Sequence, residues 1–193
     1  MSKALIVVDV QRDFCEGGSL PVTGGAAVAG RISELLTGDH GYAAVVATRD
    51  HHIDPGGHFA ADPDFVDSWP RHCVVGTGGV EFPDQLRFRE FDAVFDKGEY
   101  AAAYSGFEGR DAAGASLADW LEDRGVEQVD VCGIATDYCV RATAIDAAAE
   151  GFTTTVLLDL TAAVAPDRLD ETLEQWRIAG VATTGSLPSP NEQ

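Results

Sequence analysis

Continuous apolar runs alternate with segments of helical spacing along most of this chain, and this alternation constrains the fold more than any other feature. The runs predict buried strands at residues 4–8, 43–47, 93–95, 129–134, 154–158 and 181–183. The helical patterns fall at residues 25–36, 116–123, 137–150 and 166–179. Strands that are apolar along their whole length are covered on both faces. We therefore predict a doubly wound α/β fold, a three-layer α/β/α sandwich around a mostly parallel, Rossmann-like sheet.

The length and composition of the chain suit a single domain. Its 193 residues are 45% hydrophobic, which is enough apolar material for one full core. We predict one domain over residues 1–184 and a loose C-terminal tail at 185–193. No apolar run approaches the roughly 20 residues that span a bilayer, and the first residues predict a strand instead of a signal peptide. We therefore expect a cytoplasmic protein.

The charge and the cysteine content exclude several kinds of partner and cofactor. The formal net charge of −19 disfavours nucleic acids and anionic membranes, because both would be repelled. The four cysteines, at positions 15, 73, 132 and 139, form no CxxC pair. Neither a disulfide framework nor a zinc ribbon is therefore indicated.

Three reactive side chains are expected at the carboxyl edge of the sheet, where ligands of doubly wound proteins bind. Asp9 ends the first predicted strand, Lys97 follows the third, and Cys139 follows the fourth near the start of a helix. Asp9 and Lys97 would neutralise each other, while Lys97 and the helix N-terminus would bias the thiol towards thiolate. Cys139 is then a candidate nucleophile. The alternative is a cysteine that packs as a small apolar side chain in the core.

Four of the five histidines follow the second predicted strand, and they form a candidate metal site. In an extended segment residues i and i+2 point the same way, so Asp50 and His52 could share a cation while His51 points away. The Pro-Gly-Gly turn could bring His58 back, and His72 could be a fourth ligand. Mixed nitrogen and oxygen donors suit Zn, Mn or Fe better than Ca or Mg. The alternative is a solvated polar loop with surface histidines.

Several segments place these candidate residues among characteristic neighbours. They are VVDVQRDFCEGGSL at 7–20, ATRDHHIDPGGHF at 47–59, SWPRHC at 68–73, FDKG at 95–98, YSGF at 104–107 and GIATDYCV at 133–140. Together they resemble the nicotinamidases, a group within the isochorismatase-like cysteine hydrolases. The resemblance covers nearly the whole chain, and its motifs are highly specific.

The resemblance implies hydrolysis of nicotinamide to nicotinate and ammonia through a cysteine thioester, a step of NAD salvage, with pyrazinamide as a related substrate. It implies a catalytic triad of Asp9, Lys97 and Cys139. The oxyanion is then bound by the backbone N–H groups of Ala135 and Cys139, next to a cis peptide between Ile134 and Ala135. One divalent ion, Zn, Fe or Mn, is then held by Asp50, His52, His58 and His72. The pocket for the small-molecule substrate is then lined by Phe14, Trp69, Tyr104 and Ile134.

The chain departs from the family pattern at two positions. Arg12 stands where Asn is frequent, and Tyr138 stands beside the nucleophile where His is common. Tyr138 could alter a wall of the pocket and with it the relative rates on related aromatic amides. His51 has no role in the family and is expected to be exposed.

Two other functions stay open at this point, as does the choice between a monomer and a homo-oligomer. The first is the same fold acting on another small amide or on an N-carbamoyl compound. The second is a non-catalytic metal-binding or regulatory α/β module.

Overall fold

The sheet predicted from the apolar runs is present. The computed structural model describes residues 2–187. Its strands lie in the order β3-β2-β1-β4-β5-β6, and each neighbouring pair is parallel. Their bounds are β1 Ser2–Val8, β2 Ala44–Asp50, β3 Ala93–Lys97, β4 Val126–Ile134, β5 Thr153–Ala162 and β6 Ala182–Thr184. The prediction of a mostly parallel sheet is confirmed, with the ends of the strands shifted by a few residues.

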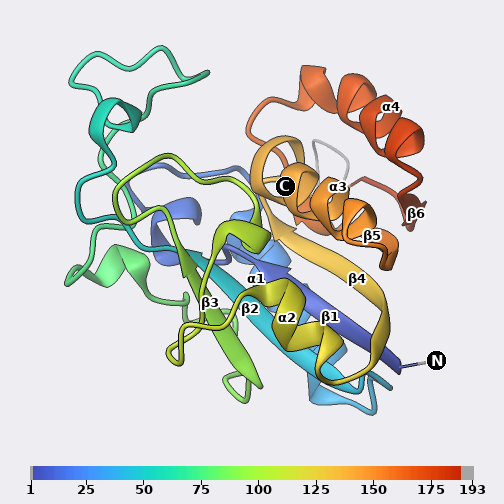
Figure 1. Cartoon of the computed structure of the whole chain (residues 1–193). Helices are drawn as coiled ribbons and strands as arrows, with labels where there is room; N and C mark the ends of the chain where they lie inside the picture. Colours follow the sequence, from blue (N-terminus) through green and yellow to red (C-terminus); the bar gives the residue numbers. More distant parts are fainter. Residues whose placement is uncertain (1, 188–193) are drawn as a thin grey trace.

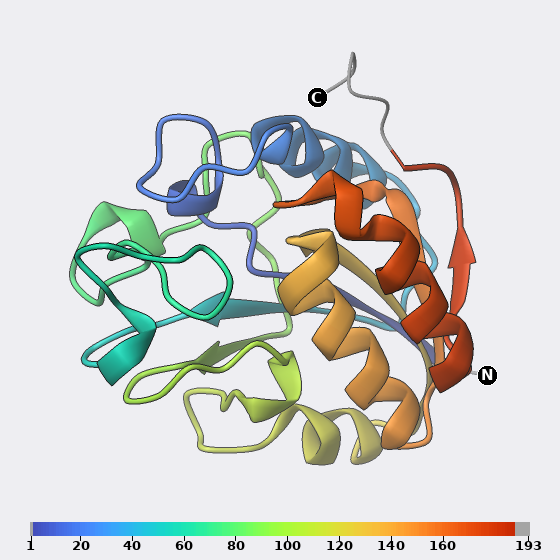
Figure 2. The ribbon, with the colours of Figure 1, turned by 90° about the horizontal axis from the view of Figure 1, so that it is seen from above.

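Helices cover both faces of the sheet. The α-helices of the described residues are α1 Gly25–Thr37, α2 Leu117–Glu122, α3 Arg141–Ala149 and α4 Leu169–Ala179. Helix α1 lies behind the sheet in Figure 1, whereas α2 and α3 lie in front of it and α4 packs beside α3. The view from above shows the same separation (Figure 2). The predicted three-layer α/β/α sandwich is therefore confirmed.

The apolar core is centred on strand β1. Residues 4–8 of this strand have no exposed surface. Side chains of a strand point alternately to the two faces, and here helices cover both faces, so the whole run is buried. Burial of each large apolar side chain contributes about 1.5–3 kcal/mol relative to exposure. This is why the runs are continuous instead of alternating.

The carboxyl ends of β1, β2, β3 and β4 form one edge of the molecule. In the register of the sheet, Val8 pairs with both Thr48 and Gly133, and Asp50 pairs with Lys97. The long irregular segment between β2 and β3, residues 51–92, gathers beyond this edge (Figure 1). Polar residues that end these strands therefore lie close together beneath loops.

The main departure from the predicted elements lies between β4 and α3. One helix was expected over residues 137–150, but the structure has a π-helical turn, Thr136–Val140, followed by α3. The wider turn is held by a hydrogen bond from the Val140 N–H to the Ala135 carbonyl. Cys139 therefore lies inside a π-helical turn and not at the start of an α-helix.

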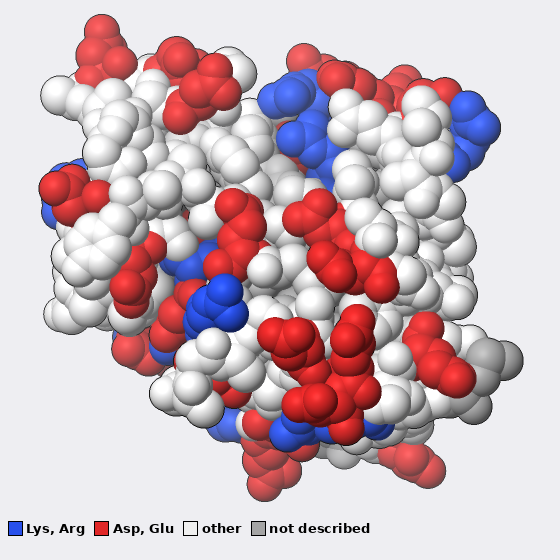
Figure 3. Space-filling view, viewed as in Figure 1, with Lys and Arg blue, Asp and Glu red and all other residues white. Residues whose placement is uncertain are grey.

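The C-terminal tail predicted at 185–193 begins after β6, and its residues 188–193 lie outside the described residues. The domain boundary at residue 184 stays a prediction. No described helix has both the length and the apolar character needed to cross a membrane. Acidic side chains are spread over the face drawn in Figure 3, and few basic ones accompany them, in line with the net charge of −19.

Gly133 lies where β4 passes closest to β1. Its φ is +120°, and a Cβ at this position would lie 2.1 Å from the carbonyl oxygen of Val8. We expect Gly133→Ala to lower the free energy of unfolding by about 3 kcal/mol, because the methyl group meets backbone and the backbone angle disfavours L residues. Chemical unfolding of the two proteins measures the difference.

Gly30→Ala is the matched control, because a Cβ at this position in α1 meets nothing within 4 Å. It should raise the free energy of unfolding by about 0.5–1 kcal/mol, since alanine is the better helix former. Equal stability of the wild type and Gly133→Ala would contradict the close contact between β1 and β4.

Candidate active site

Asp9 directly follows β1 and is fully buried. Its φ of +48° turns the chain at the end of the strand, and its N–H donates to the Thr48 carbonyl. The Thr48 hydroxyl donates a 2.6 Å hydrogen bond to Oδ1, while Oδ2 lies 2.9 Å from the ammonium of Lys97. Burial raises the pKa of the Asp9 carboxyl despite the opposing effect of Lys97. Asp9 is therefore a stronger base than an exposed aspartate.

Lys97 ends β3, and its ammonium is surrounded by acceptors. Nζ lies 2.5 Å from Asp50 Oδ1, donates to the Ala103 carbonyl at 2.9 Å and lies 3.7 Å from Cys139 Sγ. Burial alone would lower the pKa of Lys97, but the carboxylates of Asp50 and Asp9 outweigh burial and hold this pKa well above its usual value. Lys97 is thus a constant positive charge between two carboxylates.

Cys139 keeps its proton in this environment. Its sulfur and one oxygen each of Asp9 and Asp50 lie within 4.8 Å of one another. Burial raises the pKa of the Cys139 thiol well above its usual value, and burial together with the two carboxylates outweighs the opposing effect of the Lys97 ammonium. The expected bias towards thiolate is therefore wrong, because it counted the ammonium and a helix N-terminus but not burial and the carboxylates. A base next to the thiol is therefore needed to take its proton. Asp9 is the hydrogen-bond partner of the Cys139 thiol.

His52, His58 and His72 form a compact group next to this triad. Their ring nitrogens lie within 4.8 Å of one another. Nδ1 of His52 lies 2.6 Å from the Gly98 carbonyl oxygen, and Nδ1 of His72 lies 2.7 Å from the Pro70 carbonyl oxygen. A proton on each Nδ1 leaves Nε2 with a free lone pair, as in metal-binding histidines.

Asp50 joins this group and connects it to the triad. Its Oδ2 lies 3.6 Å from His52 Nε2 and 3.7 Å from His72 Nε2, while its Oδ1 faces Lys97. Burial lowers the pKa of His58 to about 4, so this ring is neutral at physiological pH. Among the described residues, His52 Nε2 and His58 Nδ1 are buried without a hydrogen-bond partner. Burying a nitrogen atom without a hydrogen-bond partner costs free energy. Neutral imidazoles together with a carboxylate are the donors that Zn, Fe and Mn prefer. These residues fit a divalent cation.

His51 directly follows β2 and points away from the group, as the alternation of side chains in an extended segment predicts. Its Nδ1 lies 3.2 Å from Glu99 Oε1, and its Nε2 lies 4.0 Å from Asp96 Oδ2. The side chain is partly buried, so the expectation that it is exposed is wrong. The carboxylates that lie beside the ring are those of Asp96, in β3, and Glu99, just after it.

A narrow, largely apolar slot with about 40 Å³ of free space leads to Cys139. It is lined by all the residues that the resemblance implies for a substrate pocket, Phe14, Trp69, Tyr104 and Ile134. The indole N–H of Trp69 donates to the Tyr104 hydroxyl at 3.2 Å, which fixes two of these rings. The peptide between Ile134 and Ala135 is cis, as the resemblance implies. Asp50, His58 and His72 also line the slot, so one ligand could face Cys139 and these two histidines together.

Other wall residues of the slot were missed by the sequence analysis. Leu20, Val22 and Val164 line it as well. Leu20 and Val22 are apolar residues in a glycine-rich loop, a pattern that could have indicated a buried wall. No local pattern marks Val164, which is brought in when its N–H donates to the Asp137 carboxylate at 2.9 Å.

Gln11 is a supporting residue that was also missed. Its side chain is fully buried and binds both backbone groups of Asp50. Nε2 donates to the Asp50 carbonyl at 2.8 Å, and Oε1 accepts from the Asp50 N–H at 2.8 Å. Nε2 also donates to the Val80 carbonyl at 3.0 Å. A buried amide in an apolar stretch is a signal that could have indicated this role, because such a group requires partners.

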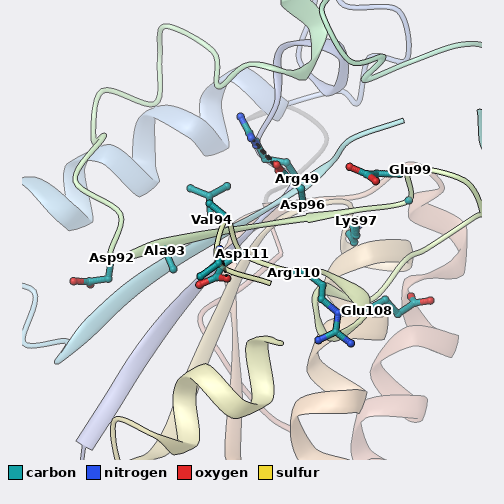
Figure 4. Close-up of a pocket in the computed structure, with 13 residues that line it drawn as sticks. Arg49, Asp92, Ala93, Val94, Asp96, Lys97, Glu99, Glu108, Arg110 and Asp111 are labelled. Atoms are coloured by element: carbon teal, nitrogen blue, oxygen red, sulfur yellow. Dashed lines mark hydrogen bonds and ion pairs between the residues drawn. The ribbon is translucent and has the colours of Figure 1, made fainter. Parts of the chain in front are cut away.

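A wider hollow, of about 810 Å³, runs along the exposed edge of β3 (Figure 4). Its lining is largely charged, and the Arg49 guanidinium pairs with Asp96 through bonds of 2.8 and 2.9 Å. Within the part of the chain that the structure describes, its lining includes neither Cys139 nor a histidine. Lys97 also borders this hollow, but Cys139, His58 and His72 line the narrow slot.

Comparison with known proteins agrees with this arrangement. The sequence profile of the isochorismatase domain matches residues 3–186. The chain belongs to the isochorismatase family. Its fold is the one found in solved members of this family: a pyrazinamidase of Pyrococcus horikoshii in complex with zinc superposes with a TM-score of 0.82 at 37% identity, over 96% of this chain and 100% of that one.

Several curated relatives have nicotinamidase in their names, among them a mycobacterial and an enterobacterial protein. The nicotinamidase/pyrazinamidase of Mycobacterium tuberculosis is 57% identical over 179 residues, which cover 93% of this chain and 96% of that protein. The nicotinamidase of Escherichia coli is 36% identical over 174 residues, which cover 81% of each chain. The similarity to both extends over most of the domain and is not confined to one motif.

Proposed function

We propose that this protein is a metal-dependent cysteine amidohydrolase that converts nicotinamide to nicotinate and ammonia and also hydrolyses pyrazinamide. The observation that carries the proposal is the meeting of Asp9, Lys97 and Cys139 with the histidine group at the end of one aromatic slot. The names of the relatives support the same substrate class. A cytoplasmic location stays a prediction, and the choice between a monomer and a homo-oligomer stays open.

The first half of the proposed reaction forms a thioester. Asp9 takes the Cys139 proton, and the sulfur attacks the carboxamide carbon of the substrate. The carbonyl bond opens to an oxyanion, which the backbone N–H groups of Ala135 and Cys139 would hold. The carbon–nitrogen bond then breaks, and Asp9 returns its proton to the leaving ammonia. Throughout, Lys97 balances the negative charge that moves between the carboxylate and the sulfur.

The second half releases the acid. Water that has given a proton to Asp9 attacks the thioester carbon, the carbon–sulfur bond breaks, and the proton returns to the sulfur of Cys139. Water has then been added across the amide bond, and the enzyme is back in its starting state. The raised pKa of the Asp9 carboxyl suits this repeated exchange of a proton.

Substrate position would be set by the walls of the slot and by the metal ligands. Phe14, Trp69, Tyr104 and Ile134 offer apolar faces and edges to a flat heteroaromatic ring. Asp50, His52, His58 and His72 would hold the divalent ion. When bound, the ion supplies a Lewis acid that can anchor the ring nitrogen directly or through a water molecule.

Replacement of the nucleophile tests the reaction class. Cys139→Ala should reduce ammonia release from nicotinamide by at least about 10⁴-fold, because no other group can form the thioester. Cys132→Ala is the matched control: this cysteine is buried in β4, and its loss should cost about 1 kcal/mol of stability while activity stays near the wild-type level. Substantial ammonia release by Cys139→Ala would disprove the mechanism.

Removal of the metal tests the substrate. A chelator should abolish nicotinamide turnover, because the ring nitrogen loses its anchor. Metal analysis should find about one divalent ion per chain in the wild type, a marked loss in His58→Ala and no loss in His40→Ala, since His40 lies outside the group. Undiminished turnover by metal-free protein would favour a hydrolase of another small amide or of an N-carbamoyl compound.

A further inference from the structure

Tyr138 forms one wall of the slot and points its hydroxyl away from it. Its ring lies edge-on to Trp69, with ring centres 5.1 Å apart, and 5.8 Å from the ring of Tyr104. All three rings line the slot. Because Tyr138 directly precedes Cys139, its position is tied to that of the nucleophile. Its ring can therefore limit what reaches the sulfur.

The Tyr138 hydroxyl lies between two segments that are far apart in the sequence. It accepts a 2.8 Å hydrogen bond from Arg168 Nη1 and donates to the Phe65 carbonyl oxygen at 3.5 Å. The Phe65 ring also lies edge-on to Trp69, at 6.2 Å. The Tyr138 hydroxyl and the edge-on contacts of Trp69 with Tyr138 and Phe65 thus connect the loop 64–68 to the segment 164–168.

Hydrogen bonds to a carboxylate hold the backbone of both joined segments, with the acceptor inside the first segment and in the π-helical turn for the second. In the first, the Asp64 carboxylate accepts hydrogen bonds from the backbone N–H groups of residues 66, 67 and 68. In the second, the Asp137 carboxylate accepts from the N–H groups of Val164 and Ala165, at 2.9 and 2.8 Å. A bond between the two segments therefore fixes their separation.

Exposed apolar side chains lie on the two segments that the Tyr138 hydroxyl joins. Phe65, Val66 and Val164 are 55%, 53% and 37% exposed, and they are three of the seven large apolar side chains that are exposed among the described residues. Val164 also lines the slot, so the slot opens beside it. Phe65 contacts Trp69, another residue that lines the slot. Exposed apolar side chains next to an opening suit the entry of a flat, weakly polar ring.

We propose that the bridge from Arg168 through the Tyr138 hydroxyl to Phe65 sets the width of this opening and makes Tyr138 a specificity-determining residue. The bridge admits amides of a single unsubstituted six-membered ring and excludes those with an added ring substituent. This inference rests on the proposed amidase function. It adds a determinant of selectivity that lies outside the triad and the metal ligands.

Two variants break the bridge from different sides. Tyr138→Phe keeps the ring and removes the hydroxyl, and Arg168→Gln removes the donor. The matched control is Arg141→Gln: the Arg141 guanidinium lies 6.0 Å from the same ring, so the same charge is lost, but the hydrogen bond to the hydroxyl stays. The measured quantity is kcat/KM for 5-methylnicotinamide relative to nicotinamide.

This ratio should rise about tenfold in Tyr138→Phe and in Arg168→Gln, the factor expected for loss of one hydrogen bond to a charged group. In Arg141→Gln the ratio of the two kcat/KM values should equal that of the wild type. Hydrogen exchange in residues 64–68 should also be faster in Arg168→Gln, because Arg168 reaches that loop through Tyr138. Ratios and exchange rates equal to those of Arg141→Gln would overturn the proposal. Failure of the wild type to hydrolyse nicotinamide would overturn the proposed function instead, and the exchange measurement would still test the bridge.

Discussion

The ammonium of Lys97 lies between the buried carboxylates of Asp9 and Asp50, and both halves of the site depend on it. Removing ions from water costs several kcal/mol for each charge, so two carboxylates could not stay ionised here without a cation. One carboxylate faces the thiol of Cys139, and the other faces the histidine group. A single ion therefore connects the nucleophile to the metal ligands.

The parallel sheet supplies the geometry that this ion needs. In the register of the strands, Asp50 is paired with Lys97, and Asp9 follows the neighbouring central strand β1. Because all of these strands end at one edge, charged side chains from distant parts of the sequence converge there. The loops beyond the edge then provide the histidines and the aromatic walls. Gln11 also holds the backbone of Asp50 through two hydrogen bonds. The position of the Asp50 carboxylate is therefore fixed by Gln11 as well as by strand β2.

Patterns within single segments could be predicted from the sequence, and so could the meeting of Asp9, Lys97 and Cys139 at the carboxyl edge of the sheet. Other contacts between segments could not be predicted. Apolar periodicity predicts the sheet and its helices, and spacing brings Asp50 and His52 together. The π-helical turn around Cys139 has no sequence signature, and the raised pKa of its thiol results from burial and from the carboxylates of Asp9 and Asp50, which other segments supply. Val164 lines the slot, and a hydrogen bond to Asp137, from another segment, holds its backbone there. Such features are set by tertiary packing, which overrides local propensity.

A double-mutant cycle on the free energy of unfolding tests most directly whether Lys97 neutralises its two neighbours. Lys97→Met should cost about 3–5 kcal/mol, because it leaves two buried carboxylates without a cation. Adding Asp9→Asn should then restore at least about 1 kcal/mol, since one of the unpaired charges is removed. If Asp9→Asn instead lowers stability in the Lys97→Met protein as much as in the wild type, the two groups are not coupled and the account is wrong.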